Sequence, residues 1–135
     1  MASYLLKTEP STYSWSDLVR EKRTVWDGIR NAAALIAIRQ MKAGDEAIIY
    51  HSGDQRAIVG IAKIVKSAYQ DPRQDDPKLA VVDVVPVKEL KEPIPLARIK
   101  AVAGLAEFPL VRISRLSTMP VNEKERKLLE QLGVK

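Results

Sequence analysis

The sequence contains no cysteine, a single histidine at His51, and no long hydrophobic run. Without cysteine there is no disulfide framework and no thiolate nucleophile, and one histidine leaves too few soft ligands for a zinc site, so we expect no metal and no cofactor. The longest uncharged apolar run, Asn31–Ile38, is far shorter than the roughly 20 residues that a membrane-spanning helix requires. The N-terminus also lacks a basic-then-apolar signal pattern. We therefore expect no membrane contact and a cytoplasmic location, or a nuclear one in a eukaryote.

Glycine-rich phosphate loops are missing as well. The six glycines are isolated from one another, so neither a P-loop nor a dinucleotide fingerprint can be drawn. Ser114, His51 and Asp27 could be named as a catalytic triad, but no serine is flanked by the glycines of a nucleophile elbow. We therefore expect no catalytic residues, and a binding module in place of an enzyme.

Size and charge indicate what kind of protein remains. A chain of 135 residues with 46% hydrophobic content can build one buried core, so we expect a single domain over residues 1–135. The net charge of +5 and the sequence pI near 9.5 favour an acidic partner such as nucleic acid. The lysines and arginines are spread along the chain, so charge alone does not identify the partner.

The order of apolar runs and turn signals predicts an α+β fold: a small curved sheet or barrel of five to six strands decorated with short helices. Gly60 indicates a bulge or a close backbone approach within a strand. We expect Leu18 and Val19 to form the buried side of the first helix, the second helix to be buried on most sides, and Pro93 and Pro95 to break the chain. The predicted strands cover residues 4–8, 46–51, 57–67, 79–87 and 110–116, and the predicted helices cover 16–22, 32–42, 96–101 and 122–132.

The aromatic residues are unevenly placed. Five of the seven lie in the first 50 residues, where aromatic faces could hold a flat heterocycle with about 1 to 3 kcal/mol per stacked ring. The simpler alternative is that both tryptophans belong to the core. These five residues are Tyr4, Tyr13, Trp15, Trp26 and Tyr50.

The residues that follow Trp26 suit a nucleic-acid base. Asp27 and Asn31 could read the polar edges of a base, amides near Gly28 offer donors, and Arg30 could meet a phosphate. Alternatively, this segment is a helix N-terminus with Asp27 or Asn31 as its cap. If Trp26 forms only a pocket wall, its replacement by alanine lowers base affinity by at least about 1 kcal/mol and leaves the fold intact.

Polar residues at two predicted strand ends could join this segment. Lys7 and Thr8 end the first strand, and His51 and Ser52 end the second, so both pairs could line one mouth of a barrel. His51 could equally be a turn histidine bonded to backbone. In the run from residue 112 to 117, Arg112 and Ser114 would share one face of a strand, and the pattern leaves open which face meets a ligand.

Together these motifs resemble the EVE domain family over essentially the whole chain. The resemblance implies a PUA-like fold related to YTH and ASCH domains, with a pocket that takes a base, often a modified cytosine or adenine flipped from DNA or RNA. By position it implies a base pocket of Trp26, Asp27, Gly28, Asn31, Lys7, Thr8, His51, Ser52 and Ser114, with Arg30 and Arg112 on phosphates. The motifs lie in residues 4–15, 25–31, 41–45, 50–52, 59–62 and 109–117.

The chain departs from the family pattern in one place. Many members continue after the Arg-Asn pair with Tyr-Gln-Ala-Arg-Asn, where this chain has Ala32-Ala33-Ala34-Leu35-Ile36. An aromatic residue, an arginine and an amide are thereby lost. Besides a modified-base reader, two alternatives stay open: a small-molecule or nucleotide-metabolism enzyme that uses the same pocket, and an RNA-binding accessory module indifferent to modification.

Overall fold

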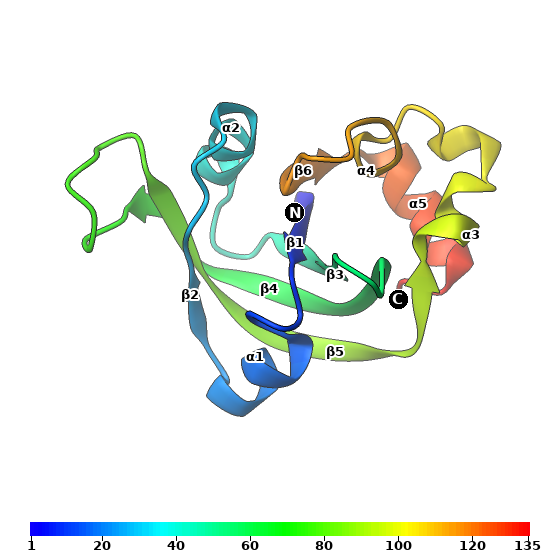
Figure 1. Ribbon diagram of the computed structural model, residues 1–135, viewed down its shortest axis with the longest axis horizontal. Coiled ribbons are helices and arrows are strands. Elements are labelled where there is room, and N and C mark those ends of the chain that lie inside the picture. Colours follow the sequence, from blue (N-terminus) through cyan, green and yellow to red (C-terminus); the bar gives the residue numbers. More distant parts are fainter.

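A computed structural model describes all residues from Met1 to Lys135. Six strands form one curved mixed sheet in the order β2-β5-β4-β3-β1-β6, which is not closed into a barrel (Figure 1). Only β1 and β3 are parallel neighbours, and every other pair is antiparallel. The elements are β1 (Ser3–Thr8), α1 (Trp15–Glu21), β2 (Thr24–Trp26), α2 (Ala32–Gln40), β3 (Glu46–His51), β4 (Ala57–Gln70), β5 (Ala80–Pro95), α3 (Leu96–Lys100), the 3-10 helix η1 (Ala103–Leu105), α4 (Pro109–Arg112), β6 (Thr118–Val121) and α5 (Glu123–Leu132).

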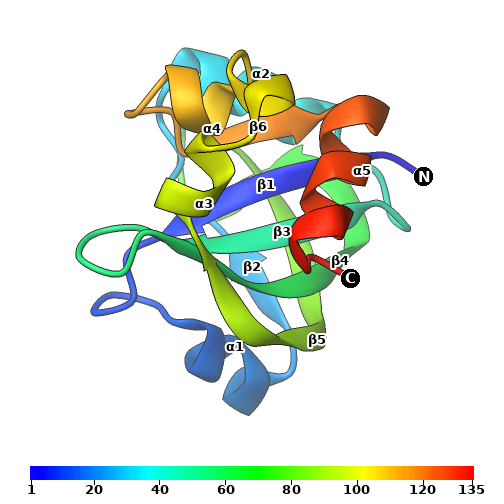
Figure 2. The same cartoon turned by 90° about the vertical axis from the view of Figure 1, so that its right-hand side faces the viewer.

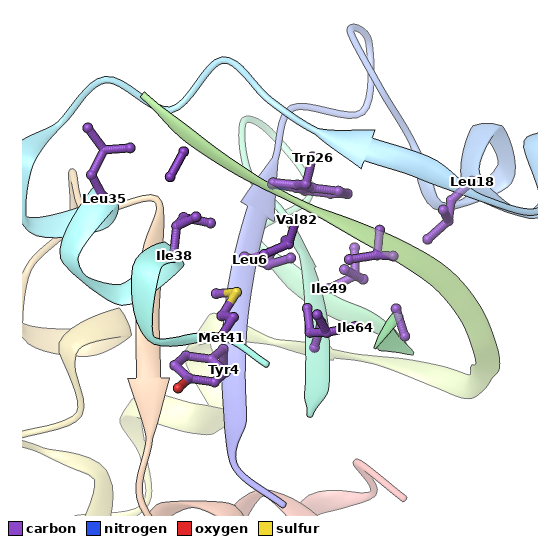
Figure 3. Packing of buried hydrophobic residues seen from close by; sticks show 14 of the residues in the cluster. Tyr4, Leu6, Leu18, Trp26, Leu35, Ile38, Met41, Ile49, Ile64 and Val82 are labelled. Carbon is purple, nitrogen blue, oxygen red and sulfur yellow. The ribbon is translucent and has the colours of Figure 1, made fainter. Parts of the chain in front are cut away.

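The sheet carries hydrophobic cores on both faces because its central strands are apolar at successive positions. In β1, Leu6 points into one core and Leu5 into the other, as alternate residues of a strand must. The first core holds the inner faces of α1 and α2 and includes Trp26 beside Val82 (Figure 3). The second lies under α3, α4 and α5, which gather at one end of the molecule (Figure 2). None of the helices combines the length and the apolarity that crossing a membrane demands.

Helix ends follow the sequence signals closely. Ser14 caps α1 and Asn122 caps α5, each in a reciprocal capping box with the residue three positions later. Two burial predictions are wrong. Val19 is exposed on α1, because only one face of this short helix meets the sheet. The helix α2 is buried on one side only, and its Ile36 is 57% exposed.

The prediction that the chain breaks at Pro93 and Pro95 is wrong for Pro93, since β5 runs on to Pro95, but it holds at Pro95, where β5 ends and α3 begins. Between Glu89 and Ile94 the pairing of β5 with β4 is interrupted, so the missing N–H of Pro93 costs no ladder hydrogen bond. Pro95 pairs opposite Ala57 at the end of the strand. Pro93 therefore marks an interruption of pairing within the strand, and Pro95 marks its end.

The predicted strand over residues 110–116 is also wrong. Pro109 occupies the first turn of the helix α4, where its fixed φ favours helix and its missing N–H is not needed. The last strand is β6, which pairs antiparallel with β1 at the edge of the sheet and tolerates Pro120 there. The three-residue strand β2 was not predicted, because it is too short to show a pattern.

Candidate functional site

An open cleft of about 550 Å³ lies where β1 ends beside β2. Its walls come from the end of β1, the loop that leads to α1, the strand β2 with the segment after it, and Arg73 of the loop between β4 and β5. The lining residues are Lys7, Thr8, Glu9, Thr12, Tyr13, Glu21, Thr24, Val25, Trp26, Asp27, Gly28, Ile29 and Arg73. The cleft thus joins Lys7, Thr8, Trp26, Asp27 and Gly28, which were predicted together from separate parts of the sequence.

Trp26 combines the two interpretations that the sequence left open. Its side chain belongs to the first core and is only 7% exposed, yet it also lines the cleft. The ring of Tyr13 meets the indole edge to face, with centroids 6.0 Å apart and planes at 89°. Because the indole carries core contacts, we expect Trp26→Ala to lower stability as well as base affinity. The cleft presents an aromatic pair, not one open indole.

Hydrogen bonds hold Tyr13 at both of its ends. Thr8 donates from its hydroxyl to the Tyr13 carbonyl at 2.7 Å, and the Tyr13 hydroxyl donates to Glu21 at 2.7 Å. Burial, together with the hydrogen bond to Glu21, raises the pKa of Tyr13 to about 12. Tyr13 is one of the five clustered aromatic residues, but it was not among the pocket residues that the family resemblance implies. Its position directly before the Ser14 cap was a usable signal, because the cap fixes the direction in which the chain enters α1.

The backbone after Trp26 is free of internal hydrogen bonds. No N–H group from Asp27 to Arg30 donates to another backbone or side-chain group of the protein. Gly28 has a φ of +79°, a left-handed conformation that side chains other than glycine rarely adopt. The Asp27 carboxylate lies 3.3 Å from the Arg73 guanidinium, and both side chains are exposed. The cleft therefore has unused backbone donors beside a carboxylate.

Lys7 is the partly buried cation of the cleft. Its ammonium donates to the Ser114 carbonyl at 3.0 Å and lies 5.8 Å from the centre of the Tyr50 ring. Desolvation lowers the pKa of this lysine below its ordinary value. Ser114 therefore supports the cleft through its carbonyl, one layer behind Lys7, and is not part of the lining.

The other predicted pocket residues lie outside the cleft. His51 is buried: its Nε2 accepts the Trp15 N–H at 3.0 Å, and its Nδ1 lies 2.7 Å from the Gln55 side-chain oxygen. This pattern corresponds to a neutral ring with its proton on Nδ1. The Ser52 N–H donates to the Thr8 carbonyl at 2.9 Å, and Asn31 caps α2. These residues shape the neighbourhood of the cleft without facing it.

The two arginines predicted to meet phosphates also lie outside the cleft. Arg30 is exposed just beyond its edge, whereas Arg112 is the last residue of α4 and pairs with Glu107 at 3.4 Å. The idea that Arg112 and Ser114 share one face of a strand is wrong, because this part of the chain is a helical turn followed by a loop. Arg112 therefore has an acidic neighbour, in a pair whose two side chains are both exposed.

Three acids and two bases give the cleft a slightly negative balance. Hydrogen bonds from Ser11 lower the pKa of Glu9, which stays ionised at neutral pH. Glu21 and Asp27 oppose Lys7 and Arg73. No group of three or more histidine, cysteine or carboxylate side chains gathers in a geometry that could hold a metal ion. Chemically, the cleft offers an aromatic wall, hydrogen-bond donors and acceptors, and little attraction for a phosphate.

Comparison with known proteins gives a consistent result over the whole chain. The family model described as EVE domain matches residues 2–132. Thymocyte nuclear protein 1 from Mus musculus is 36% identical over 156 aligned positions, which cover 90% of this chain and 69% of that protein.

Solved structures agree with this match. A protein from Rhodopseudomonas palustris is 41% identical with a TM-score of 0.92, covering 98% of this chain and 93% of that one. The human THYN1 protein, solved in complex with DNA that contains 5-methylcytosine, is 32% identical with a TM-score of 0.89, covering 98% and 97%. An ASCH protein from Zymomonas mobilis is 14% identical with a TM-score of 0.64, which shows a shared fold. The expected PUA-like architecture is confirmed.

Proposed function

Because this chain belongs to the EVE domain family, we propose that it is a nucleic-acid-binding module whose cleft receives a modified base turned out of its strand. The observation that supports this most directly is the cleft itself, in which Tyr13 and Trp26 lie beside backbone N–H groups that form no hydrogen bond within the protein. The related human THYN1 protein, in complex with DNA containing 5-methylcytosine, makes that base in DNA the first ligand to test. The place of action is the cytoplasm, or the nucleus in a eukaryote.

The chemistry of the lining supports a base as the ligand. Free N–H groups near Gly28 can donate to ring nitrogen or carbonyl acceptors, and the Asp27 carboxylate can accept from an exocyclic amine. Turning a base out of its stack costs a few kcal/mol. One aromatic stack returns about 1 to 3 kcal/mol, so edge hydrogen bonds are needed as well. The cleft supplies both kinds of contact.

Roles follow from position. Tyr13 and Trp26 contact the face of the base, while Asp27, the Gly28 backbone, Thr8 and Lys7 surround its edges. Asn31, His51, Ser52 and Ser114 act behind this first layer by fixing the segments that carry it. Arg30 meets the phosphate chain outside the cleft, whereas Arg112, paired with Glu107, is a weaker candidate for such a contact.

Binding without turnover is the favoured activity. An enzyme of this cleft would need a positioned base, and His51 is bonded to the Trp15 N–H and to Gln55. The hydroxyl of Thr8 is likewise engaged, since it donates to the Tyr13 carbonyl. Incubation with free 5-methyl-2′-deoxycytidine should return the nucleoside unchanged. Steady turnover that stops in a His51→Ala variant would establish an enzyme instead.

A matched pair of tyrosine variants tests the reader function. Tyr13→Leu removes the aromatic face in the cleft, whereas Tyr69→Leu removes a half-buried tyrosine bonded to Asp83 and outside the cleft. Anisotropy titrations compare a duplex carrying one 5-methylcytosine with the same duplex unmodified. Tyr13→Leu should weaken binding of the modified duplex by about 1 to 3 kcal/mol, and Tyr69→Leu should not. Equal affinity of the unmodified protein for both duplexes would refute modified-base recognition.

A further inference from the structure

We propose that a groove beside the cleft, bordered by Arg30, Arg39 and Lys78, binds the sugar-phosphate backbone of the strand whose base enters the cleft. This inference rests on the proposed function and extends it to a second contact surface. The groove has a volume of about 470 Å³ and lies between α2 and the loop that joins β4 to β5. Figure 1 shows that loop extending beside α2.

The three cations of this groove are available to a ligand. Arg30 and Lys78 are exposed, and neither side chain has an acidic partner or a hydrogen bond within the protein. Arg39 donates one N–H to the Lys78 carbonyl at 2.6 Å, which steadies its guanidinium and leaves its other donors free. The single acid of the groove, Asp76, already accepts the Lys78 N–H at 2.9 Å. The groove thus has an excess of two positive charges.

The floor of the groove indicates more than a site for a lone anion. Ala32, Leu35, Ile36 and Leu79 form it, and Ile36 is 57% exposed. An isolated phosphate would gain nothing from an apolar floor, because only the cations can contact it favourably. A nucleic-acid strand presents apolar sugar faces between its phosphates, so a cationic rim over an apolar floor matches its chemistry.

The groove is continuous with the cleft. Gly28 and Ile29 line both the cleft and a small hollow beside it. Arg30 and Leu79 line that same hollow and also the groove. A strand whose base occupies the cleft can therefore pass along this track, and its neighbouring phosphates reach Arg30 first.

The distribution of charge supports different ligands for the two surfaces, a base for the cleft and phosphates for the groove. The cleft has more acids than bases, so it repels phosphates and favours an uncharged base. On the other side of the cleft, Lys7 is engaged with Ser114 and Arg112 with Glu107. On the α2 side, Arg30, Arg39 and Lys78 border one groove without an acidic partner, which favours that direction for the strand.

The test compares two double variants by the salt dependence of DNA binding. Arg39→Gln with Lys78→Gln removes two groove cations, and Arg98→Gln with Lys100→Gln removes two exposed cations from α3 at the opposite end of the molecule. Each phosphate contact contributes about 0.9 to the slope of log affinity against log salt. Loss of both contacts should therefore make the fall in affinity between about 50 and 200 mM NaCl about 12 times smaller. The control should behave as the unmodified protein does.

Two duplexes and a nucleoside separate this inference from the proposed function. The groove variant should weaken binding of modified and unmodified duplexes by the same factor, leaving their ratio and the NMR titration with 5-methyl-2′-deoxycytidine unchanged. If the groove and control variants show the same salt slope, the groove assignment is overturned, even where modified DNA is still preferred. If the slope changes as expected but the unmodified protein binds both duplexes equally, the groove stands and the modified-base function fails. Failure of the unmodified protein to bind either duplex overturns the groove.

Discussion

Trp15 and Trp26 are almost equally buried, at 5% and 7% exposed, but their surroundings differ. Trp15 is closed in on all sides. A Cβ placed on Gly60 would lie 2.6 Å from its ring, and the backbone N–H of Trp15 donates to buried His51. Trp26 borders a cleft and is followed by a backbone that forms no internal hydrogen bonds.

This difference teaches that exposure alone does not separate a structural aromatic residue from a binding one. What separates them is whether the unbonded polar groups nearby border an open cleft. Around Trp15 the backbone N–H and His51 satisfy each other and the unbonded indole Nε1 is buried, whereas the unbonded N–H groups after Trp26 belong to a segment that lines the cleft. We therefore expect substitutions at the two positions to affect different measurements.

The largest effect is expected at Trp15. Trp15→Ala should lower the free energy of unfolding by about 3 to 5 kcal/mol, because a large buried ring leaves a cavity that its neighbours cannot fill. Gly60→Ala should cost about 1 to 3 kcal/mol by forcing a methyl group against the same ring. Urea denaturation measures both values. If each substitution lowered the free energy of unfolding by less than about 1 kcal/mol, Trp15 would not be tightly packed.

Trp26 should affect both stability and binding. Trp26→Ala should lower the free energy of unfolding by about 3 kcal/mol, at the lower end for a buried ring because the space opens toward the cleft. The affinity for a modified base should fall by at least about 1 kcal/mol. Trp26→Phe retains an aromatic ring and allows the binding effect to be measured on a well-folded protein. If base affinity fell equally in a folded Trp15→Phe variant, the contrast between the two tryptophans would be lost.

A smaller effect is expected from Tyr13 at alkaline pH. Its pKa is about 12 in the folded protein, above the ordinary value of 10, so the hydroxyl contributes stability that is complete below pH 10. This contribution is lost as the pH rises from 10 to 12, because the unfolded chain ionises first. The melting temperature of Tyr13→Phe should therefore fall less over that interval than the melting temperature of the unmodified protein. An identical fall in both would show that folding does not raise the pKa of Tyr13.

The smallest effect on stability is expected at Asp27. Its ion pair with Arg73 is exposed, so Asp27→Asn should change the free energy of unfolding by no more than about 0.5 kcal/mol. The same change should weaken binding of bases that carry an exocyclic amine, because the carboxylate acceptor is partly lost. Arg73→Gln serves as the matched control for the ion pair. If both variants weakened base binding equally, the pair as a whole, not the carboxylate, would be responsible.

The sequence predicted those elements whose signals are local. The helices that Ser14 and Asn122 cap were predicted from the sequence, and a capping box needs only residues within one turn. Gly60 predicted a close approach of another group to the strand, and the group that approaches is the ring of Trp15. The alternating pattern after Leu110 misled, since Pro109 starts a helical turn there and tertiary packing decides between the two structures.

The cleft was predictable only in part. Trp26, Asp27 and Gly28 are neighbours in the chain, and their composition indicated a site. Arg73 comes from a loop that is distant in sequence, and only the pairing of β4 with β5 brings it to Asp27. Sequence order likewise could not show that His51 faces α1 in place of the cleft, because that depends on how the turn after β3 lies against Trp15.

The unbonded backbone from Asp27 to Arg30 also gives the molecule a natural reporter. Amide hydrogens that form no hydrogen bond exchange quickly with deuterated solvent, whereas those hydrogen-bonded in the central strands exchange only when the fold opens. A base that accepts hydrogen bonds from this segment would slow its exchange while leaving the strands as they were. Peptide-level mass spectrometry could then locate the occupied surface without any label or substitution.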